Sequence, residues 1–149
     1  MYHSNSAPLP VPQPLTEEQM KNLLALSAES PTTQDLHDVV KIVLNTGMRA
    51  GELCELRFAD VDHNNRQLVF NATKSCTRRV VPVGPETLQI LESRRELQPE
   101  LEFVLGKCPR GVVKRVERQL RTLKGMSRVS LHMLRRAFYL RPGLQNEQK

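Results

Sequence analysis

The 149-residue sequence has no long apolar run, few cysteines and no cluster of acidic residues, and each absence excludes a class of protein. No apolar stretch approaches the length of a membrane span and no signal peptide is visible, so we expect a cytoplasmic protein without a membrane partner. Cys54, Cys76 and Cys108 are too few and too widely spaced for a zinc knuckle or a disulfide framework. We interpret them as free thiols, with a disulfide as the alternative. Without clustered carboxylates to hold catalytic magnesium, the sequence argues against a two-metal nuclease.

The length and composition are those of one globular domain. A chain of 149 residues can enclose one sizeable core and not two. Hydrophobic residues make up 39% of the chain and charged residues 26%, which is ordinary for a globular protein. Residues 1–14 contain four prolines, and we interpret them as a flexible tail or linker before a single domain at 15–149.

Charge is distributed unevenly along the chain. Residues 106–149 hold twelve Lys or Arg against two Glu, a net charge of +10, whereas residues 1–105 hold ten basic and fourteen acidic residues, a net charge of −4. This asymmetry indicates a polyanionic partner, with nucleic acid ahead of anionic membrane. The alternative is a solvated basic face that only keeps the domain dispersed in water.

Apolar periodicity predicts an α+β fold that is mainly helical with a small antiparallel sheet. We predict helices over residues 16–28, 35–45, 49–56, 85–96, 112–124 and 130–140, and strands at 67–70 and 79–83 with a further short strand at 60–62. Residues 64–65 should form a turn and 73–77 a hairpin tip, while 103–105 form a buried segment of undecided type. The helix at 112–124 should bury Val112, Val116, Leu120 and Leu123 and expose Lys114, Arg118 and Arg121.

Four residues have the chemistry needed to act on a phosphodiester. Arg49 follows a glycine turn directly, Lys74 lies on the predicted hairpin tip, and His132 and Arg135 are three apart on one helix, so they share a face. Each alone has an ordinary explanation as a surface, solvated or structural residue. Together, two arginines can bind the non-bridging oxygens, the lysine can protonate a leaving oxygen, and the histidine can exchange a proton nearby. Phosphoryl transfer depends mainly on such charge stabilisation and positioning, so no metal is required.

Three motifs, in order, resemble those of the tyrosine recombinase, or phage integrase, family. The segment TGMRAGELCELR at 46–57 resembles the first arginine box of the family, and the two strands around Thr73-Lys74 and RVVPV at 79–83 resemble its lysine hairpin. The segment HMLRRAF at 132–138 resembles its His-x-x-Arg box. The order and spacing match over roughly residues 15–140, so the resemblance implies a partial tyrosine recombinase catalytic fold.

The resemblance also implies a role for each matching residue. Arg49 and Arg135 would clamp the scissile phosphate, Lys74 would be the general acid for the leaving 5′ hydroxyl, His132 would assist proton transfer, and Glu52 would support the arginine and histidine cluster. We expect double-stranded DNA as the partner, with other recombinase subunits as further candidates, and no cofactor, metal or small-molecule substrate. The residues expected to contact DNA outside the catalytic cluster are Lys114, Arg118, Arg121 and Arg136.

The nucleophile of the family has no counterpart at the expected position. Only Tyr2 and Tyr139 are present, and Tyr139 lies one helical turn beyond Arg135, where we interpret it as a core or interface side chain. The chain would be a DNA strand-transferase by family, but we expect it to be inactive alone, because no 3′-phosphotyrosyl intermediate can form. It could be a fragment, a truncated relict or a protein completed by a partner's tyrosine. The alternatives are a catalytically dead DNA-binding relict or regulator and a general basic nucleic-acid-binding domain.

Overall fold

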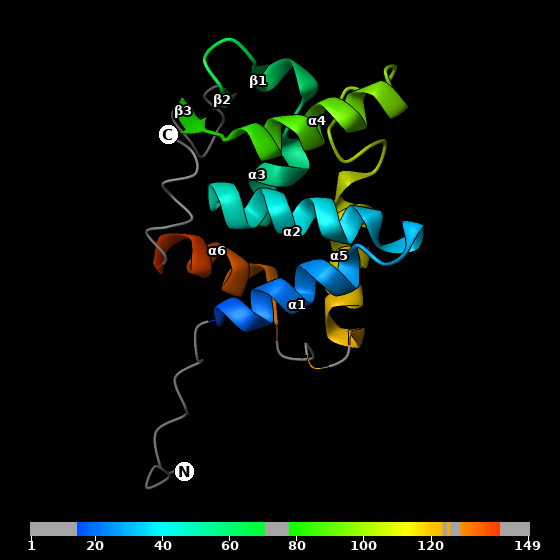
Figure 1. Ribbon diagram of the computed structural model, residues 1–149. Helices are drawn as coiled ribbons and strands as arrows, with labels where there is room; N and C mark the ends of the chain where they lie inside the picture. The colour runs from blue at the N-terminus through cyan, green and yellow to red at the C-terminus, as the bar shows by residue number, and fades with distance from the viewer. Residues whose placement is uncertain (1–14, 71–77, 124, 126–128, 141–149) are drawn as a thin grey trace, which may run out of the picture.

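The computed structural model describes residues 15–70, 78–123, 125 and 129–140. Its helices surround one central helix, α2 (Gln34–Thr46), and a small sheet lies beside them (Figure 1). The other α-helices are α1 (Glu17–Ser27), α3 (Ala50–Glu55), α4 (Pro85–Leu97), α5 (Pro109–Thr122) and α6 (Leu131–Leu140). Two short 3₁₀ helices, η1 (Pro31–Thr33) and η2 (Phe58–Asp60), connect them. The predicted α+β class is confirmed. No helix of the described residues is long and apolar enough to cross a membrane.

The helix α1 begins where the sequence predicts, because its first turn is capped from both sides. The hydroxyl of Thr16 accepts a hydrogen bond from the backbone N–H of Gln19 at 3.1 Å, and the side chain of Gln19 accepts one from the backbone N–H of Thr16 at 2.9 Å. This reciprocal pair satisfies two backbone donors that the helix leaves free. The helix then packs along α2 through Met20 and Leu23, which are both buried.

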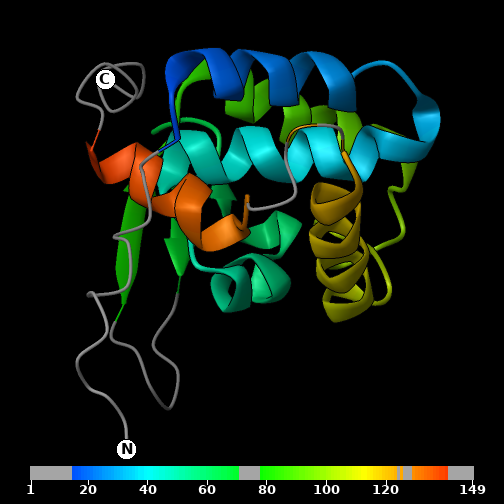
Figure 2. The same cartoon turned by 90° about the horizontal axis from the view of Figure 1, so that it is seen from below.

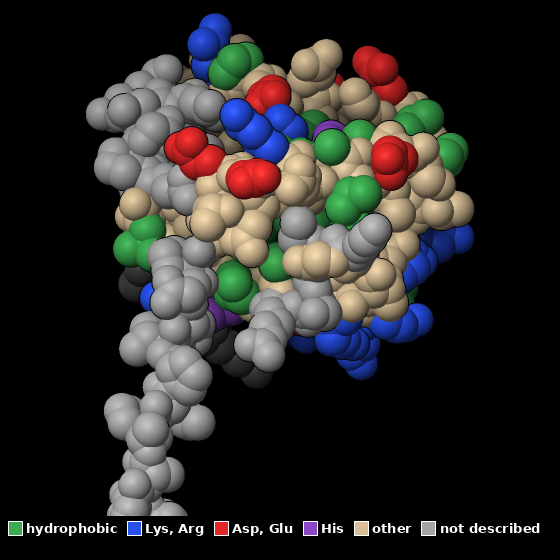
Figure 3. Space-filling model, turned by 60° about the horizontal axis from the view of Figure 1, so that its bottom comes forward, with side chains coloured by type: hydrophobic (Ala, Val, Ile, Leu, Met, Phe, Trp, Pro, Cys, Tyr) green, Lys and Arg blue, Asp and Glu red, His purple; other side chains and the backbone are tan. Residues whose placement is uncertain are grey.

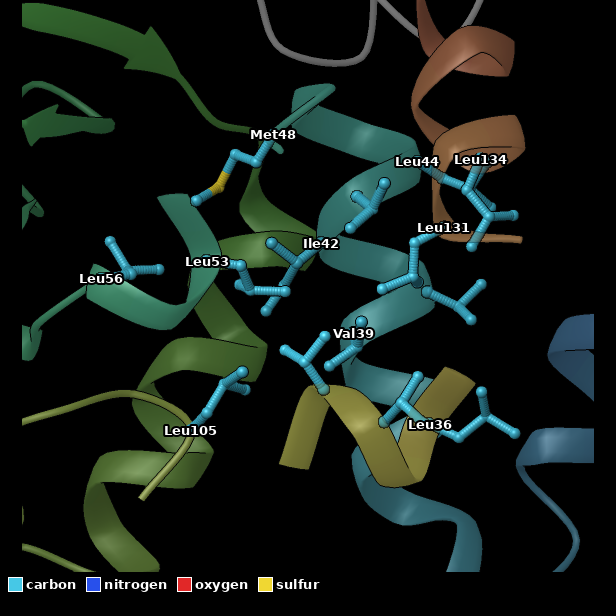
Figure 4. Close-up of a cluster of buried hydrophobic side chains, with 14 of the residues drawn as sticks. Leu36, Val39, Ile42, Leu44, Met48, Leu53, Leu56, Leu105, Leu131 and Leu134 are labelled. Atoms are coloured by element: carbon cyan, nitrogen blue, oxygen red, sulfur yellow. The ribbon is translucent and has the colours of Figure 1, made fainter. Parts of the chain in front are cut away.

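The central helix α2 contacts α1, α4, α5 and α6, and it is buried on almost every side. Its apolar residues Leu36, Val39, Val40, Ile42, Val43 and Leu44 are each at most 3% exposed. Figure 4 shows several of these side chains meeting leucines of α3, α6 and the loop before α5. Each fully buried leucine or isoleucine contributes about 1.5–3 kcal/mol by removing apolar area from water. Val43, Leu53, Leu56 and Phe138 are all buried in this core.

The sheet has three antiparallel strands in the order β1 (Val61–Asp62), β2 (Gln67–Phe70) and β3 (Arg79–Pro82). Leu68 pairs with Val81, and both side chains are buried against the helices. The predicted third strand therefore exists, but Asp60 lies in η2 and not in the strand.

At the turn before β2, hydrogen bonds from the side chain and backbone of Asn65 hold the pKa of Asp62 below its usual range. The predicted hairpin tip lies outside the described residues.

Residues 102–105 attach the loop before α5 to the end of α3. Phe103 forms an isolated antiparallel bridge with Arg57, and the backbone N–H of Val104 donates to the carbonyl of Leu56 at 3.0 Å. Val104 and Leu105 are each 2% exposed. The segment whose type the sequence leaves undecided is therefore one bridge residue, Phe103, followed by a turn that closes the core beside α3.

The helix α5 begins at Pro109, three residues before the predicted start, because proline fits the first helical turn, where its missing N–H has no partner to lose. The predicted buried face is wrong by one residue. Val113, not Val112, forms the buried row with Val116 and Leu120, while Val112 and Leu123 lie half-buried beside it. The reason is geometric, since residues 113, 116 and 120 recur at the helical period and bring one stripe onto α2 and α3.

Candidate phosphate and DNA-binding site

The first predicted site residue, Arg49, projects from the surface directly after a buried turn. Gly47 ends α2 with a φ of +69°, and its N–H donates to the carbonyl of Val43 at 2.8 Å. Met48 is 1% exposed and anchors the turn in the core, whereas Arg49 is exposed at the start of α3. Among the described residues, no carboxylate forms a salt bridge with the Arg49 guanidinium. A fixed backbone thus presents a charged group that no described carboxylate neutralises.

The helix α6 packs on this same turn, and Gly47 makes the approach possible. A Cβ atom at position 47 would lie 2.4 Å from Cδ1 of Phe138 and 3.1 Å from Cε2 of Tyr139, far inside contact distance. The positive φ and the close packing both require glycine here. Gly47 therefore connects the first motif to the third, 85 or more residues later in the chain.

Arg135 bonds directly to that turn. Its Nε donates to the carbonyl oxygen of Gly47 at 2.8 Å, which leaves the two terminal nitrogens of the guanidinium for another acceptor. The guanidinium carbon also lies 5.3 Å from the centre of the Tyr139 ring, a distance at which cation and ring attract. The structure therefore anchors Arg135 to Gly47, which lies two residues before Arg49 in the sequence.

The remaining predicted catalytic residues differ in what the structure says of them. His132 is exposed in the first turn of α6, three residues before Arg135 and on the same side of the helix. Lys74 lies in residues 71–77, outside the described part of the chain. Tyr139 is 50% exposed, so of its two expected positions the core is wrong, and the interface position stays a prediction. Its ring packs edge-on against Phe138, with centroids 5.0 Å apart, and covers Arg135.

Glu52 supports Arg49 through the backbone. Its Oε1 accepts a hydrogen bond of 2.9 Å from the N–H of Arg49, which closes the first turn of α3. Its Oε2 forms a salt bridge with Nη1 of Arg79, the first residue of β3. Sequence reasoning did not single out Arg79, because an arginine beside a hairpin looks like an ordinary surface residue. Its neighbour Arg78 could not be distinguished from Arg79 without the contact.

Four basic residues form one exposed row along α5, which we call the α5 basic row: Arg110, Lys114, Arg118 and Arg121. Their spacing places them on the side of the helix opposite the buried Val116. None of the four forms a salt bridge with a described residue. Figure 3 shows Lys and Arg side chains gathered at the lower right, over α5.

Arg110 was missed because the sequence placed the start of the helix at Val112. The predicted DNA contact Arg136 is half-buried on α6 and lies apart from the row.

The two basic regions lie at opposite ends of α2. Arg115 of α5 forms a 2.5 Å salt bridge with Asp35 at the beginning of α2, and Arg135 bonds to Gly47 at its end. Figure 2 shows α5 crossing α2 at one end and α6 lying at the other. A helix of 13 residues is about 20 Å long, which is roughly half of the 34 Å turn of B-form DNA. Within the described residues, no group of three or more His, Cys, Asp or Glu could hold a metal ion.

The fold thus brings the first arginine motif and the His-x-x-Arg helix to one buried turn. The phage integrase family model matches residues 13–141, and the chain belongs to this family. It matches the catalytic domain of tyrosine recombinases, so the resemblance found in the sequence is confirmed.

The relatives that match the chain are named as tyrosine recombinases. The chain is 34% identical over 102 residues to tyrosine recombinase XerA of Thermococcus kodakarensis, covering 66% of this chain and 34% of that protein. It is 29% identical over 140 residues to tyrosine recombinase XerC of Xanthomonas axonopodis pv. citri, covering 89% of this chain and 46% of that protein. The chain therefore spans between about a third and a half of the length of these relatives.

Solved structures share the fold. The crystal structure of XerA recombinase matches with a TM-score of 0.71 at 23% identity, over 89% of this chain and 50% of that chain. A lambda integrase tetramer bound to a Holliday junction matches with a TM-score of 0.62 at 19% identity, over 85% of this chain and 41% of that chain. These likenesses confirm a mainly helical recombinase catalytic fold with a small antiparallel sheet.

Proposed function

We propose that the chain provides the phosphate-binding part of a site-specific tyrosine recombinase, in which Arg49 and Arg135 bind one phosphate of duplex DNA. The observation that carries the proposal is the hydrogen bond between Arg135 and Gly47, because it fixes the third motif against the turn that presents Arg49. Two guanidinium groups beside one phosphodiester would neutralise the charge that develops on its non-bridging oxygens. The names and DNA complexes of the relatives support the same substrate.

The other catalytic roles follow from the motifs. In this proposal Lys74 protonates the leaving 5′ hydroxyl, and His132 holds or exchanges a proton one helical turn from Arg135. Glu52 fixes the backbone of Arg49 and contacts no DNA. No residue in this set requires a metal ion, since arginine and lysine already supply the positive charge.

Duplex DNA is the proposed partner of the α5 basic row as well. No described carboxylate forms a salt bridge with its four side chains, and the row and the arginine pair lie toward opposite ends of α2, so one duplex could contact both regions. Contacts of this kind position the protein and do not read sequence. Assembly with further recombinase subunits is part of the proposal, by analogy with the lambda integrase tetramer on its junction.

The sequence contains two tyrosines, Tyr2 and Tyr139. Tyr2 lies outside the described residues, and the ring of Tyr139 covers Arg135. We propose that this chain alone binds DNA without forming a 3′-phosphotyrosyl bond, and that strand transfer needs a tyrosine from outside these residues. A second candidate function is a DNA-binding relict or regulator that occupies recombination sites or pairs with an intact recombinase. The unpaired α5 basic row favours this candidate, because it would bind DNA without any turnover.

Capture of covalent adducts tests the inactive state. The chain is incubated with a pool of nicked duplexes of random sequence, and protein that stays attached to DNA in detergent is collected. We expect none from the wild-type chain, together with reversible binding to the same pool. An adduct that disappears in Tyr139→Phe would assign Tyr139 as the nucleophile and overturn the proposal. Absence of reversible binding would count against both candidate functions.

A further inference from the structure

The carboxylate of Glu52 creates an electrostatic problem beside the proposed phosphate. Its Oε1 accepts a hydrogen bond from the backbone N–H of Arg49. A negative charge is therefore held next to a residue that is proposed to bind phosphate. The Glu52 side chain is only 15% exposed, and water therefore screens this charge poorly. Left alone, it would repel the phosphate that Arg49 binds.

Arg79 pairs with this carboxylate from the sheet. Its Nη1 bonds to Oε2 of Glu52, the oxygen that Arg49 does not use, and the Arg79 side chain is 34% exposed. The carboxylate is therefore fixed on both sides, by the backbone of α3 and by β3. Pairing with arginine keeps Glu52 in one orientation and cancels its charge.

We infer that Arg79 is a positioning residue of the proposed phosphate site, which acts by neutralising Glu52 and not by binding phosphate. The inference rests on the proposed function of Arg49 and Arg135. It explains why a carboxylate is compatible with a site for a polyanion. The Glu52 carboxylate has two opposite effects. It orders the backbone of Arg49, and it weakens phosphate binding unless Arg79 is present.

A four-variant cycle distinguishes this role from direct contact. Inorganic phosphate is titrated into the full ¹⁵N-labelled chain, and its affinity is read from the side-chain N–H signals of Arg49 and Arg135. Arg79→Gln should weaken phosphate binding on the order of tenfold, because one buried negative charge is no longer compensated. Glu52→Gln should bind at least as tightly as wild type, since the glutamine oxygen can still accept from Arg49.

The double variant decides between the two roles. With Glu52→Gln and Arg79→Gln together, no carboxylate remains to compensate, and affinity should return to within about threefold of wild type. If the double variant is as weak as Arg79→Gln, Arg79 binds phosphate directly and the inference is overturned. An unchanged affinity in Arg79→Gln overturns it as well.

Controls keep this result separate from the wider proposal and from unfolding. Wild-type signals that do not respond to phosphate would remove the phosphate site and this inference together, whereas a responsive wild type with no recovery in the double variant removes the inference alone. Thermal melting checks that each variant is folded. If Arg79→Gln is unfolded, Arg79→Lys should retain affinity within about threefold while keeping the charge, and a larger loss would contradict neutralisation as its role.

Discussion

The Nε of Arg135 donates a 2.8 Å hydrogen bond to the carbonyl of Gly47, across 88 residues of sequence. This contact joins the turn that ends α2 to the helix that carries the His-x-x-Arg motif. It depends on a glycine, because α6 approaches so closely that any side chain at position 47 would overlap the Phe138 ring. The stability of the fold and the geometry of the proposed phosphate site therefore share one residue.

Gly47→Ala should lower the free energy of unfolding by about 2–4 kcal/mol, because it adds both a strained positive φ and an overpacked contact with Phe138. Urea denaturation measures the change. Gly51→Ala is the matched control, since a Cβ there meets nothing within 4 Å and alanine favours the helix by up to about 1 kcal/mol. Equal effects at the two glycines would contradict the close packing of α6.

Arg94→Leu should destabilise the fold by about 3 kcal/mol, because it leaves Asp38 buried without its cationic partner. The Arg94 Nη1 lies 2.8 Å from Asp38 Oδ2 and 3.0 Å from Asp35 Oδ1, and its Nε donates to the carbonyl of Val104. Asp38 is 5% exposed. Thermal or urea unfolding measures the loss. The control is Lys21→Ala, at an exposed position of α1, which should change stability by less than about 0.5 kcal/mol. An equally small change for Arg94→Leu would contradict the stabilising role of the contacts between Arg94, Asp35 and Asp38.

The two described cysteines should react very differently with iodoacetamide. Burial raises the pKa of the Cys54 thiol, whereas Cys108 is exposed. Mass spectrometry of the native chain should find Cys108 labelled and Cys54 labelled only after unfolding. The raised pKa has a further consequence in alkaline solution. The unfolded thiol ionises first, so the contribution of Cys54 to stability is intact below its unfolded pKa and is lost as pH rises towards its folded pKa. Rapid labelling of native Cys54 would contradict its burial.

Arg118→Ala should weaken binding to any duplex and reduce the slope of log affinity against log salt concentration by about 1. Arg115→Ala is a matched control, because it removes the same charge from the same helix but from a side chain already paired with Asp35. Fluorescence anisotropy with a labelled duplex at several salt concentrations measures both. If Arg115→Ala reduces the slope as much as Arg118→Ala, the unpaired row has no special part in DNA binding.

Local features were predictable from the sequence, and long-range pairings were not. Thr16 and Gln19 identify the start of α1 because a capping box depends on residues three apart. The arginine and histidine motifs were equally visible, because each is contiguous. By contrast, the pairing of Glu52 with Arg79 joins residues 27 apart on different elements, and no periodicity marks it.

The errors on α5 and α6 have physical causes. Val112 and Val113 are adjacent and equally apolar, so the phase of α5 was decided only by which one meets α2 and α3. The early start at Pro109 added Arg110 to the basic row. The sequence allowed Tyr139 a core or an interface position; Phe138 fills the core and leaves the Tyr139 ring half exposed over Arg135.

The central claim is that Arg49 and Arg135 bind one phosphate, and a single titration tests it most directly. Inorganic phosphate is added to the ¹⁵N-labelled Arg49→Ala variant, and the side-chain signal of Arg135 is followed. If the two arginines share one ligand, the dissociation constant read at Arg135 should rise on the order of tenfold or more, because half of the charge is gone. An Arg135 titration identical to that of the wild-type chain would show two independent sites and contradict the account.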